Sequence, residues 1–208
     1  MLIRSASGLR GIAKDHFTPE LIDKYISAFI NTQNIKSCVI GRDGRPSGKQ
    51  IALWVIDSLH KKRVNVDNCG LATTPTMQIM TEKENYDGGI VITASHNPSE
   101  YNGLKFLQND GTFLSPEQCE ELFKAVDQNI SVENSESLGV VSDYSTANKE
   151  HIHKVLSAKC IDVESVIQKK FTVVIDAVNG AGSYILPTLC EQLGCKVITI
   201  NCNGDGNF

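Results

Sequence analysis

Strand-like and helix-like stretches alternate along this sequence. Short segments rich in β-branched and other apolar residues are typical of buried strands, and longer segments whose apolar residues recur every three or four positions are typical of helices with one buried face. The predicted strands span residues 38–40, 64–71, 90–93, 171–176 and 196–201. The predicted helices begin at residues 19 and 74 and cover 48–62, 115–128, 146–157 and 182–193. This alternation predicts an α/β fold, with helices on the faces of a sheet.

Two of the predicted helices carry strong start signals. Thr18-Pro19-Glu20 combines an N-cap residue, a proline suited to the first helical position and an acid in the first turn. Ser115 and Gln118 have the spacing of a capping box, in which each side chain satisfies a backbone N–H of the other residue. We therefore expect helices to begin at residues 19 and 116.

A change of composition suggests two domains. Residues 129–142 are rich in Ser, Glu and Asn and lack helical periodicity, which is typical of a connector. We expect one domain over residues 1–141 and the opening part of a second over 142–208. The second part holds one βαβ unit, which is too little to close a sheet, so we expect the chain to be cut short.

Composition and charge exclude several classes of partner. The 208 residues are 41% hydrophobic and carry a net charge of −4, which favours a globular protein and argues against nucleic acid or an anionic membrane as the main partner. No apolar run approaches the roughly 20 residues that span a bilayer, and the first residues lack a signal peptide. We expect a cytoplasmic protein. The seven cysteines are scattered without paired CxxC motifs, so neither a zinc site nor a disulfide framework is expected.

The most informative segment contains Ser95 at the end of a predicted strand. Pro98 disfavours helical geometry at Asn97, so the chain turns directly beside Ser95 and leaves its hydroxyl exposed. A serine that carries a phosphoryl group needs exposure, donors for a dianion and a group that moves a proton. The turn offers backbone N–H groups, His96 offers an imidazole, and Lys105 adds a cation. A plain turn, in which Ser95 and Asn97 bond the backbone, remains the alternative from these residues alone.

Two further loops carry arginine beside glycine. In the segment 41–48 (GRDGRPSG), Arg42 and Arg45 near a helix start are suited to binding phosphate, but pairing of Asp43 with either arginine would equally fix the turn. The segment lacks the spacing of a nucleotide P-loop, so ATP binding is not expected. In the segment 5–11, Gly8 allows close backbone approach and Arg10 can reach an anion.

In this order, the segments SGLRG (7–11), GRDGRPSG (41–48), GGIVITASHNPSEYNGLKF (88–106) and VVIDAVNGAGS (173–183) resemble the α-D-phosphohexomutase family, which includes phosphoglucomutases and phosphomannomutases. The resemblance covers essentially the whole chain. It implies that residues 1–141 form the first of four α/β domains, a mixed sheet sandwiched by helices, and that 142–208 open a similar second domain. The rest of the second domain, with its aspartate-rich metal loop, and the third and fourth domains are expected beyond Phe208.

The resemblance also implies roles for individual residues. Ser95 is the expected phosphoserine and, through its phosphate, a ligand of Mg²⁺. Lys105 and His96 are the candidates for proton transfer, with Lys105 preferred because desolvation lowers the pKa of a lysine. Arg10 and Ser7, with Asn97 and Lys105, are expected to hold phosphate or substrate. The first motif reads SASG where many relatives have GTSG, which leaves the roles of Ser5 and Ala6 open.

The implied activity is a phosphosugar mutase that interconverts hexose 1-phosphate and hexose 6-phosphate through phosphoserine and a bisphosphorylated sugar. Thr93 favours the phosphoglucomutase and phosphomannomutase branches, because relatives acting on glucosamine phosphate usually have serine there. A phosphoglucosamine mutase and a non-catalytic sugar-phosphate-binding relative are the alternatives. A mutase using an aspartyl phosphate is not expected, because a DxDx[TV] run is missing. The fragment alone is expected to be inactive, since the cleft needs its other walls.

Overall fold

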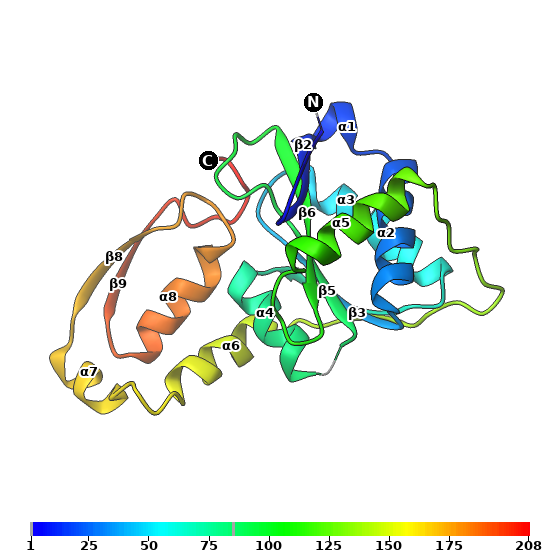
Figure 1. Cartoon of the computed structure of the whole chain (residues 1–208). Helices are drawn as coiled ribbons and strands as arrows, with labels where there is room; N and C mark the ends of the chain where they lie inside the picture. Colours follow the sequence, from blue (N-terminus) through cyan, green and yellow to red (C-terminus); the bar gives the residue numbers. More distant parts are fainter. Residues whose placement is uncertain (1, 85) are drawn as a thin grey trace.

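Seven strands form one mixed sheet in the first part of the chain (Figure 1). The computed structural model describes residues 2–84 and 86–208. The strand order is β1-β2-β6-β5-β3-β4-β7, with β3, β4, β5 and β7 parallel and β6 antiparallel to its neighbours β5 and β2. The strands are β1 (Ile3–Ser5), β2 (Gly8–Ile12), β3 (Ser37–Arg42), β4 (Asn65–Leu71), β5 (Gly88–Ile92), β6 (Tyr101–Gln108) and β7 (Val141–Asp143).

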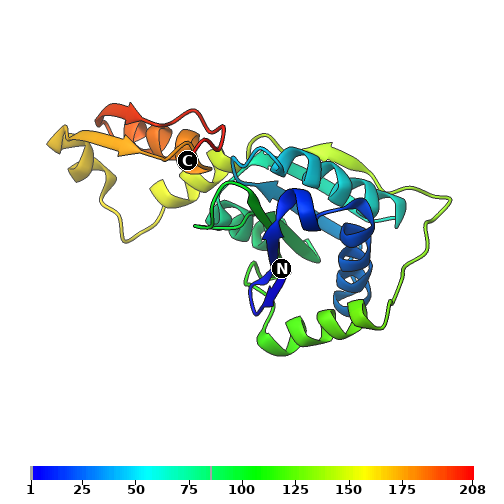
Figure 2. The ribbon, with the colours of Figure 1, turned by 90° about the horizontal axis from the view of Figure 1, so that it is seen from above.

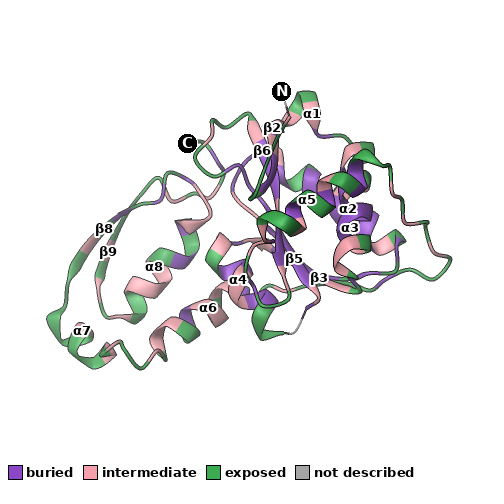
Figure 3. Ribbon diagram, viewed as in Figure 1, coloured by how far each residue is buried: buried purple, intermediate pink, exposed green. Residues whose placement is uncertain are grey.

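Helices cover both faces of this sheet, which confirms the predicted mixed sheet sandwiched by helices. The helices of this part are α1 (Ala13–His16), α2 (Pro19–Gln33), α3 (Gly48–Lys61), α4 (Thr74–Lys83) and α5 (Pro116–Asp127). One apolar core joins α2, α3 and α5 to Ile40, Ile90 and Phe106, and a second joins α4 to Val39 and Val91. Neighbouring residues of β3 and β5 thus belong to opposite cores, as the two-residue period of a strand requires. Figure 3 shows the buried residues of these strands in purple.

Both predicted helix starts are confirmed. Thr18 precedes α2, and its hydroxyl accepts a hydrogen bond from the backbone N–H of Leu21 at 3.2 Å. Ser115 and Gln118 form the complete capping box before α5, with both reciprocal hydrogen bonds present. Each cap satisfies N–H groups that have no partner inside the helix.

Strands β2 and β6 were not predicted as strands, although they carry much of the site. Both contain glycine and lack the apolar alternation on which a strand prediction depends. Their pairing sets Arg10 opposite Gly103, and β6 pairs with β5 so that Lys105 lies opposite Val91. The sheet therefore brings the N-terminal segment and Lys105 beside the strand that ends near Ser95.

The second part of the chain contains α6 (Ala147–Leu156), α7 (Val163–Lys169), β8 (Thr172–Asp176), α8 (Gly182–Gln192) and β9 (Lys196–Ile200). Strands β8 and β9 are parallel, which confirms the predicted βαβ unit. The connector before it has no regular structure over residues 130–140, and β7 then joins the first sheet beside β4. Strand β7 straddles the predicted boundary at residues 141 and 142, which stays a prediction.

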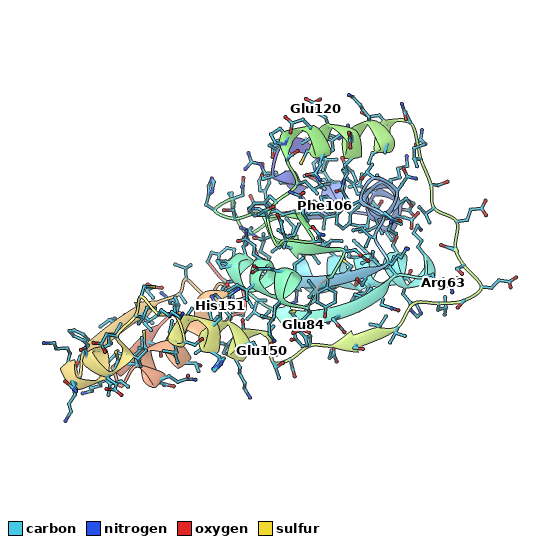
Figure 4. The ribbon with its side chains drawn as sticks, turned by 60° about the horizontal axis from the view of Figure 1, so that its bottom comes forward. Arg63, Glu84, Phe106, Glu120, Glu150 and His151 are labelled. Carbon is cyan, nitrogen blue, oxygen red and sulfur yellow. The ribbon has the colours of Figure 1, made fainter. Side chains whose placement is uncertain are left out.

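The two parts meet through α4 and α6, seen from above in Figure 2. The Nδ1 atom of His151, on α6, lies 2.9 Å from Oγ1 of Thr76 on α4, and desolvation by burial lowers the pKa of this imidazole. Figure 4 labels His151 and Glu150 on α6, and Glu84, the residue that follows α4. Within the described residues, no helix is both long and apolar enough to cross a membrane.

Candidate functional site

Ser95 lies in the turn that follows β5, with its side chain exposed. Its φ is 56°, in the left-handed region that a residue with a side chain adopts only when its surroundings hold it there. The preceding strand is fully buried, whereas the chain becomes exposed at Ser95 and His96. Ser95 is therefore exposed directly after a buried strand, as predicted.

Arg45 holds this turn from beneath. Its side chain is completely buried, and its Nη atoms donate to the backbone carbonyl oxygens of three loop residues and of the first residue of β6. Those residues are Ser95 (2.9 Å), Asn97 (2.7 Å), Pro98 and Tyr101 (3.0 Å). The Nε atom donates to Oδ2 of Asp43 at 3.0 Å. All five N–H donors of the guanidinium thus meet an acceptor.

For Arg45, this arrangement favours the fixing of the turn over the binding of a ligand phosphate. The Asp43–Arg45 ion pair fixes the turn, and the buried Arg45 has no donor left for a ligand phosphate. The Arg42 side chain instead donates a hydrogen bond to the carbonyl oxygen of Asp43 at 2.9 Å. Arg45 therefore acts on Ser95 through the backbone of the loop.

Asp43 and Thr93 complete a ring of hydrogen bonds around Ser95. Oγ1 of Thr93 donates to Oδ2 of Asp43 at 2.6 Å and accepts the backbone N–H of Ser95 at 3.0 Å. Because Arg45 binds the carbonyl oxygen of the same serine, both backbone polar groups of Ser95 are fixed. The ring explains how the left-handed conformation is maintained while the hydroxyl stays available.

Gly8 allows the N-terminal strand to approach β6 closely. A Cβ at this position would lie 2.0 Å from the carbonyl oxygen of Leu104, and its φ of 105° suits glycine alone. Gly103 makes the reciprocal approach, because a Cβ there would lie 2.5 Å from the carbonyl oxygen of Leu9. The two glycines bring Arg10 and Lys105 to the same side of the loop.

A cavity of about 160 Å³ lies between these elements. Five of the six predicted site residues line it, namely Ser7, Arg10, Ser95, His96 and Lys105. The other lining residues are Ser5, Gly8, Leu9, Thr93 and Ala94. The sixth, Asn97, donates its side-chain amide to the carbonyl oxygen of Ala94 at 2.8 Å. Its predicted part in phosphate binding stays a prediction, and the contact shown is within the turn. The roles of the other five likewise remain predictions.

The cavity is electropositive where Arg10 and Lys105 meet. Desolvation, with a smaller contribution from the nearby charge of Arg10, lowers the pKa of Lys105. Nε of Arg10 is buried and has no hydrogen-bond partner in the described structure. An unsatisfied buried N–H is costly unless something accepts from it, so this donor is suited to an anionic ligand.

Three residues beside the loop escaped the sequence-based site prediction. Ser5 lines the cavity, and its Oγ lies 3.0 Å from Oγ of Ser7. Thr93 was considered only as a marker of the substrate branch. Arg45 was considered as an anion ligand or as a partner of Asp43 that fixes the turn, but not as a residue that holds the Ser95 loop.

The residues around Ser95 do not by themselves suit a Mg²⁺ ion. Within residues 2–84 and 86–208, no three His, Cys, Asp or Glu side chains are grouped as metal ligands. The carboxylate beside the loop, that of Asp43, is already engaged by Arg45 and Thr93. A phosphate on Ser95 would add oxygen ligands, but the rest of a coordination shell is not supplied by this part of the protein.

Two protein-family models match the chain. Residues 1–133 match "Phosphoglucomutase/phosphomannomutase, alpha/beta/alpha domain I", and residues 149–208 match domain II of the same family. A protein named phosphoglucomutase/phosphomannomutase from Thermococcus kodakarensis is 38% identical and aligns with 97% of this chain but 45% of its own length. One named probable phosphoglucosamine mutase from Methanopyrus kandleri is 33% identical, with 97% and 44% covered.

Solved structures show the same fold. A putative phosphomannomutase from Thermus thermophilus superposes with a TM-score of 0.84 at 20% identity, over 99% of this chain and 47% of the other. A phosphoglucomutase/phosphomannomutase family protein from Burkholderia thailandensis gives 0.79 at 24% identity, over 99% and 46%. The chain thus spans a little less than half the length of the proteins it matches.

Proposed function

Because the chain belongs to the phosphoglucomutase/phosphomannomutase family, we propose that it is the phosphoserine-bearing part of a phosphosugar mutase. The observation that supports this most directly is the geometry of Ser95. Its hydroxyl is exposed beside a cavity that holds Arg10 and Lys105, while both backbone polar groups of the same residue are fixed. A fixed backbone and an available oxygen are what a repeated acceptor and donor of phosphate needs.

In the proposed reaction, the Ser95 phosphate is transferred to a hydroxyl of a hexose monophosphate. The bond between phosphorus and Oγ of Ser95 breaks, and a bond to the sugar oxygen forms. The resulting bisphosphate reorients, and its other phosphoryl group returns to Ser95. The net change is an exchange between hexose 1-phosphate and hexose 6-phosphate.

Lys105 is the preferred group for the proton of the attacking hydroxyl. Desolvation lowers its pKa and so raises the fraction of neutral amine that can accept a proton. The resulting ammonium can deliver that proton to the departing Oγ of Ser95. In the return step the same amine can take the proton of the Ser95 hydroxyl and pass it to the departing sugar oxygen. His96 lines the same cavity and is the second candidate for this role.

Arg10 and Ser7 are the proposed ligands of phosphate oxygens. The unsatisfied Nε of Arg10 offers a charge-assisted donor, which is among the stronger hydrogen bonds a protein makes. Ser7, in the loop between β1 and β2, adds a hydroxyl to the lining of the same cavity. Asn97 is kept as a proposed ligand on the strength of the family resemblance.

Mg²⁺ is the proposed cofactor, also on the strength of that resemblance. When bound, it would neutralise charge on the transferred phosphoryl group, and Ser95 would contribute a ligand through its phosphate. The remaining ligands, and the other walls of the cleft, are proposed to come from further domains of the same polypeptide. The cytoplasmic location stays a prediction.

Glucose and mannose phosphates are the proposed substrates, and glucosamine phosphate is the alternative. Thr93 supports the first choice, whereas relatives named phosphoglucosamine mutase support the second. A binding protein without turnover is the remaining possibility.

An assay of the complete gene product distinguishes the proposed substrates from one another and from binding without turnover. The protein is supplied with the 1-phosphates of glucose, mannose and glucosamine. A trace of the matching 1,6-bisphosphate is added, and ³¹P NMR follows the appearance of 6-phosphate. We expect turnover of at least one sugar and a loss of at least about 10³-fold in Ser95→Ala. Binding without turnover would favour a sugar-phosphate-binding protein, and full activity of Ser95→Ala would disprove the proposed function.

A further inference from the structure

Phe208 covers the face of the guanidinium that holds the Ser95 loop. The central carbon of that group, in Arg45, lies 4.8 Å from the centroid of the Phe208 ring. All five N–H donors of Arg45 are used within its plane, so a partner from elsewhere in the protein can add contact only at the faces. An aromatic ring over an arginine face is a favourable cation–π arrangement.

The second part of the chain fixes the segment that carries Phe208. Asn179, in the turn after β8, accepts the backbone N–H of Gly206 on its carbonyl oxygen at 2.9 Å. Its side-chain amide donates to the carbonyl oxygen of Asn207 at 2.9 Å, and its Oδ1 accepts the N–H of Asn203 at 3.0 Å. One asparagine thus holds the chain on both sides of Gly206 and directs it toward Arg45.

The backbones of the 41–48 segment and of the second part of the chain are in close contact. A Cβ on Gly44 would lie 2.8 Å from the carbonyl oxygen of Asn179, and one on Gly206 would lie 2.3 Å from the carbonyl oxygen of Gly44. Gly44 belongs to the 41–48 segment, and Gly206 to the segment after β9. The two parts of the chain therefore meet directly behind the Ser95 loop, with glycine where side chains would separate them.

We propose that Arg45 is a positioning residue for Ser95, and that Phe208 couples docking of the second part of the chain to the geometry of the Ser95 loop. The role in phosphoryl transfer rests on the proposed function. A shift of the Arg45 guanidinium would move four carbonyl groups together, including that of Ser95 itself. A misplacement of about 1 Å at a reacting group costs about 10²-fold in rate, so small movements here matter.

Hydrogen exchange in the 208-residue chain tests the coupling between Phe208 and the Ser95 loop without measuring phosphoryl transfer. The Ser95 amide is protected by Thr93, so its exchange rate reports the loop. We expect Phe208→Ala to raise that rate about tenfold, and Phe208→Tyr, which keeps the ring, to stay within about twofold of the wild type. Phe171→Ala is the matched control, because Phe171 is 50% exposed and Phe208 is 51% exposed.

Arg45→Lys should raise exchange further, because a lysine cannot reach the same set of carbonyls. If this variant fails to fold, the Phe208 series still decides the question. Equal exchange rates in Phe208→Ala and Phe171→Ala would overturn the coupling.

Kinetics of the complete gene product test the positioning role separately. Phe208→Ala should lower kcat about tenfold while KM for the hexose phosphate changes less than twofold, because loop position affects the transfer step more than binding. Raised exchange with an unchanged kcat would overturn the positioning role. Absence of turnover in the wild type would disprove the proposed function but would not change the exchange result. The proposed function and the coupling through Phe208 are therefore tested by different observations.

Discussion

Oγ1 of Thr93 donates a 2.6 Å hydrogen bond to the Asp43 carboxylate, which also pairs with the fully buried Arg45. One carboxylate therefore supports both the end of β5 and the cation that holds the Ser95 loop. Because the loop geometry depends on this charge, substitutions at Asp43 should affect stability and the site together.

Asp43→Asn should be strongly destabilising. It leaves the charge of Arg45 buried without its partner, and breaking a buried ion pair in this way costs about 3–5 kcal/mol. Urea unfolding measures the change, with Asp57→Asn as control. Asp57 pairs with Lys61 on an exposed helix surface and should cost less than about 1 kcal/mol. Equal effects of the two variants would contradict the structural role of Asp43.

Gly8→Ala should damage the fold at the junction of β2 and β6. The new Cβ would overlap the carbonyl oxygen of Leu104 and would sit on a backbone with positive φ, so the cost should reach about 2 kcal/mol or more. Thermal unfolding is the measurement. In Gly182→Ala the new Cβ meets only Leu186 at an ordinary 3.4 Å, so this control should stay near the wild type. A Gly8 variant as stable as that control would show that β2 can move away from β6 without loss.

Lys105→Met should raise the unfolding midpoint at pH 7. The folded protein lowers the pKa of Lys105 below its ordinary value of 10.5, so the charged form is less favourable in the folded state than in the unfolded one. This penalty is fully present below the folded-state pKa and disappears as pH rises toward 10.5, so the advantage of methionine should shrink over that interval.

Urea unfolding over a pH series, with the exposed Lys159→Met as control, provides the comparison. A Lys105→Met variant that is less stable than the wild type at pH 7 would show that the ammonium is stabilised in the fold. That result would remove the main reason to prefer Lys105 for proton transfer.

The sequence was sufficient to predict the regular elements whose signals are local. The capping box at Ser115 and the buried strand before Ser95 depend only on neighbouring residues, and both are present. The hydrogen-bond partners of the Arg45 side chain could not be predicted from neighbouring residues. The choice between binding a ligand and holding a loop depends on carbonyl groups about fifty positions away, which only the folded sheet brings close.

The glycine-rich strands explain the other omissions. Gly8 and Gly103 contribute no apolar side chain, so β2 and β6 lack a strand pattern, yet their missing Cβ atoms are what lets the strands meet. The contact of His151 with Thr76 likewise depends on packing between α4 and α6, not on the helix itself. Sequence patterns record burial within an element, whereas these positions are determined by contact between elements.

The 208-residue chain by itself should not convert hexose phosphates. Its cavity of about 160 Å³ is small for a hexose phosphate and is bounded only by residues around the Ser95 loop. Phosphoryl transfer requires the sugar to be held in line with Ser95, which needs contacts on its other sides. The ³¹P NMR assay applied to this chain should show no 6-phosphate. Sustained turnover would mean that the site is already complete.

The central claim, that Ser95 carries the phosphoryl group, is tested most directly by phosphopeptide mapping of the purified complete gene product. Ser99 lies in the same exposed loop and provides the control. A fraction of the wild type and of Ser99→Ala should carry one added phosphoryl group at Ser95, and Ser95→Ala should carry none. A phosphoryl group located at another residue, with Ser95 unmodified even after incubation with hexose 1,6-bisphosphate, would contradict the account.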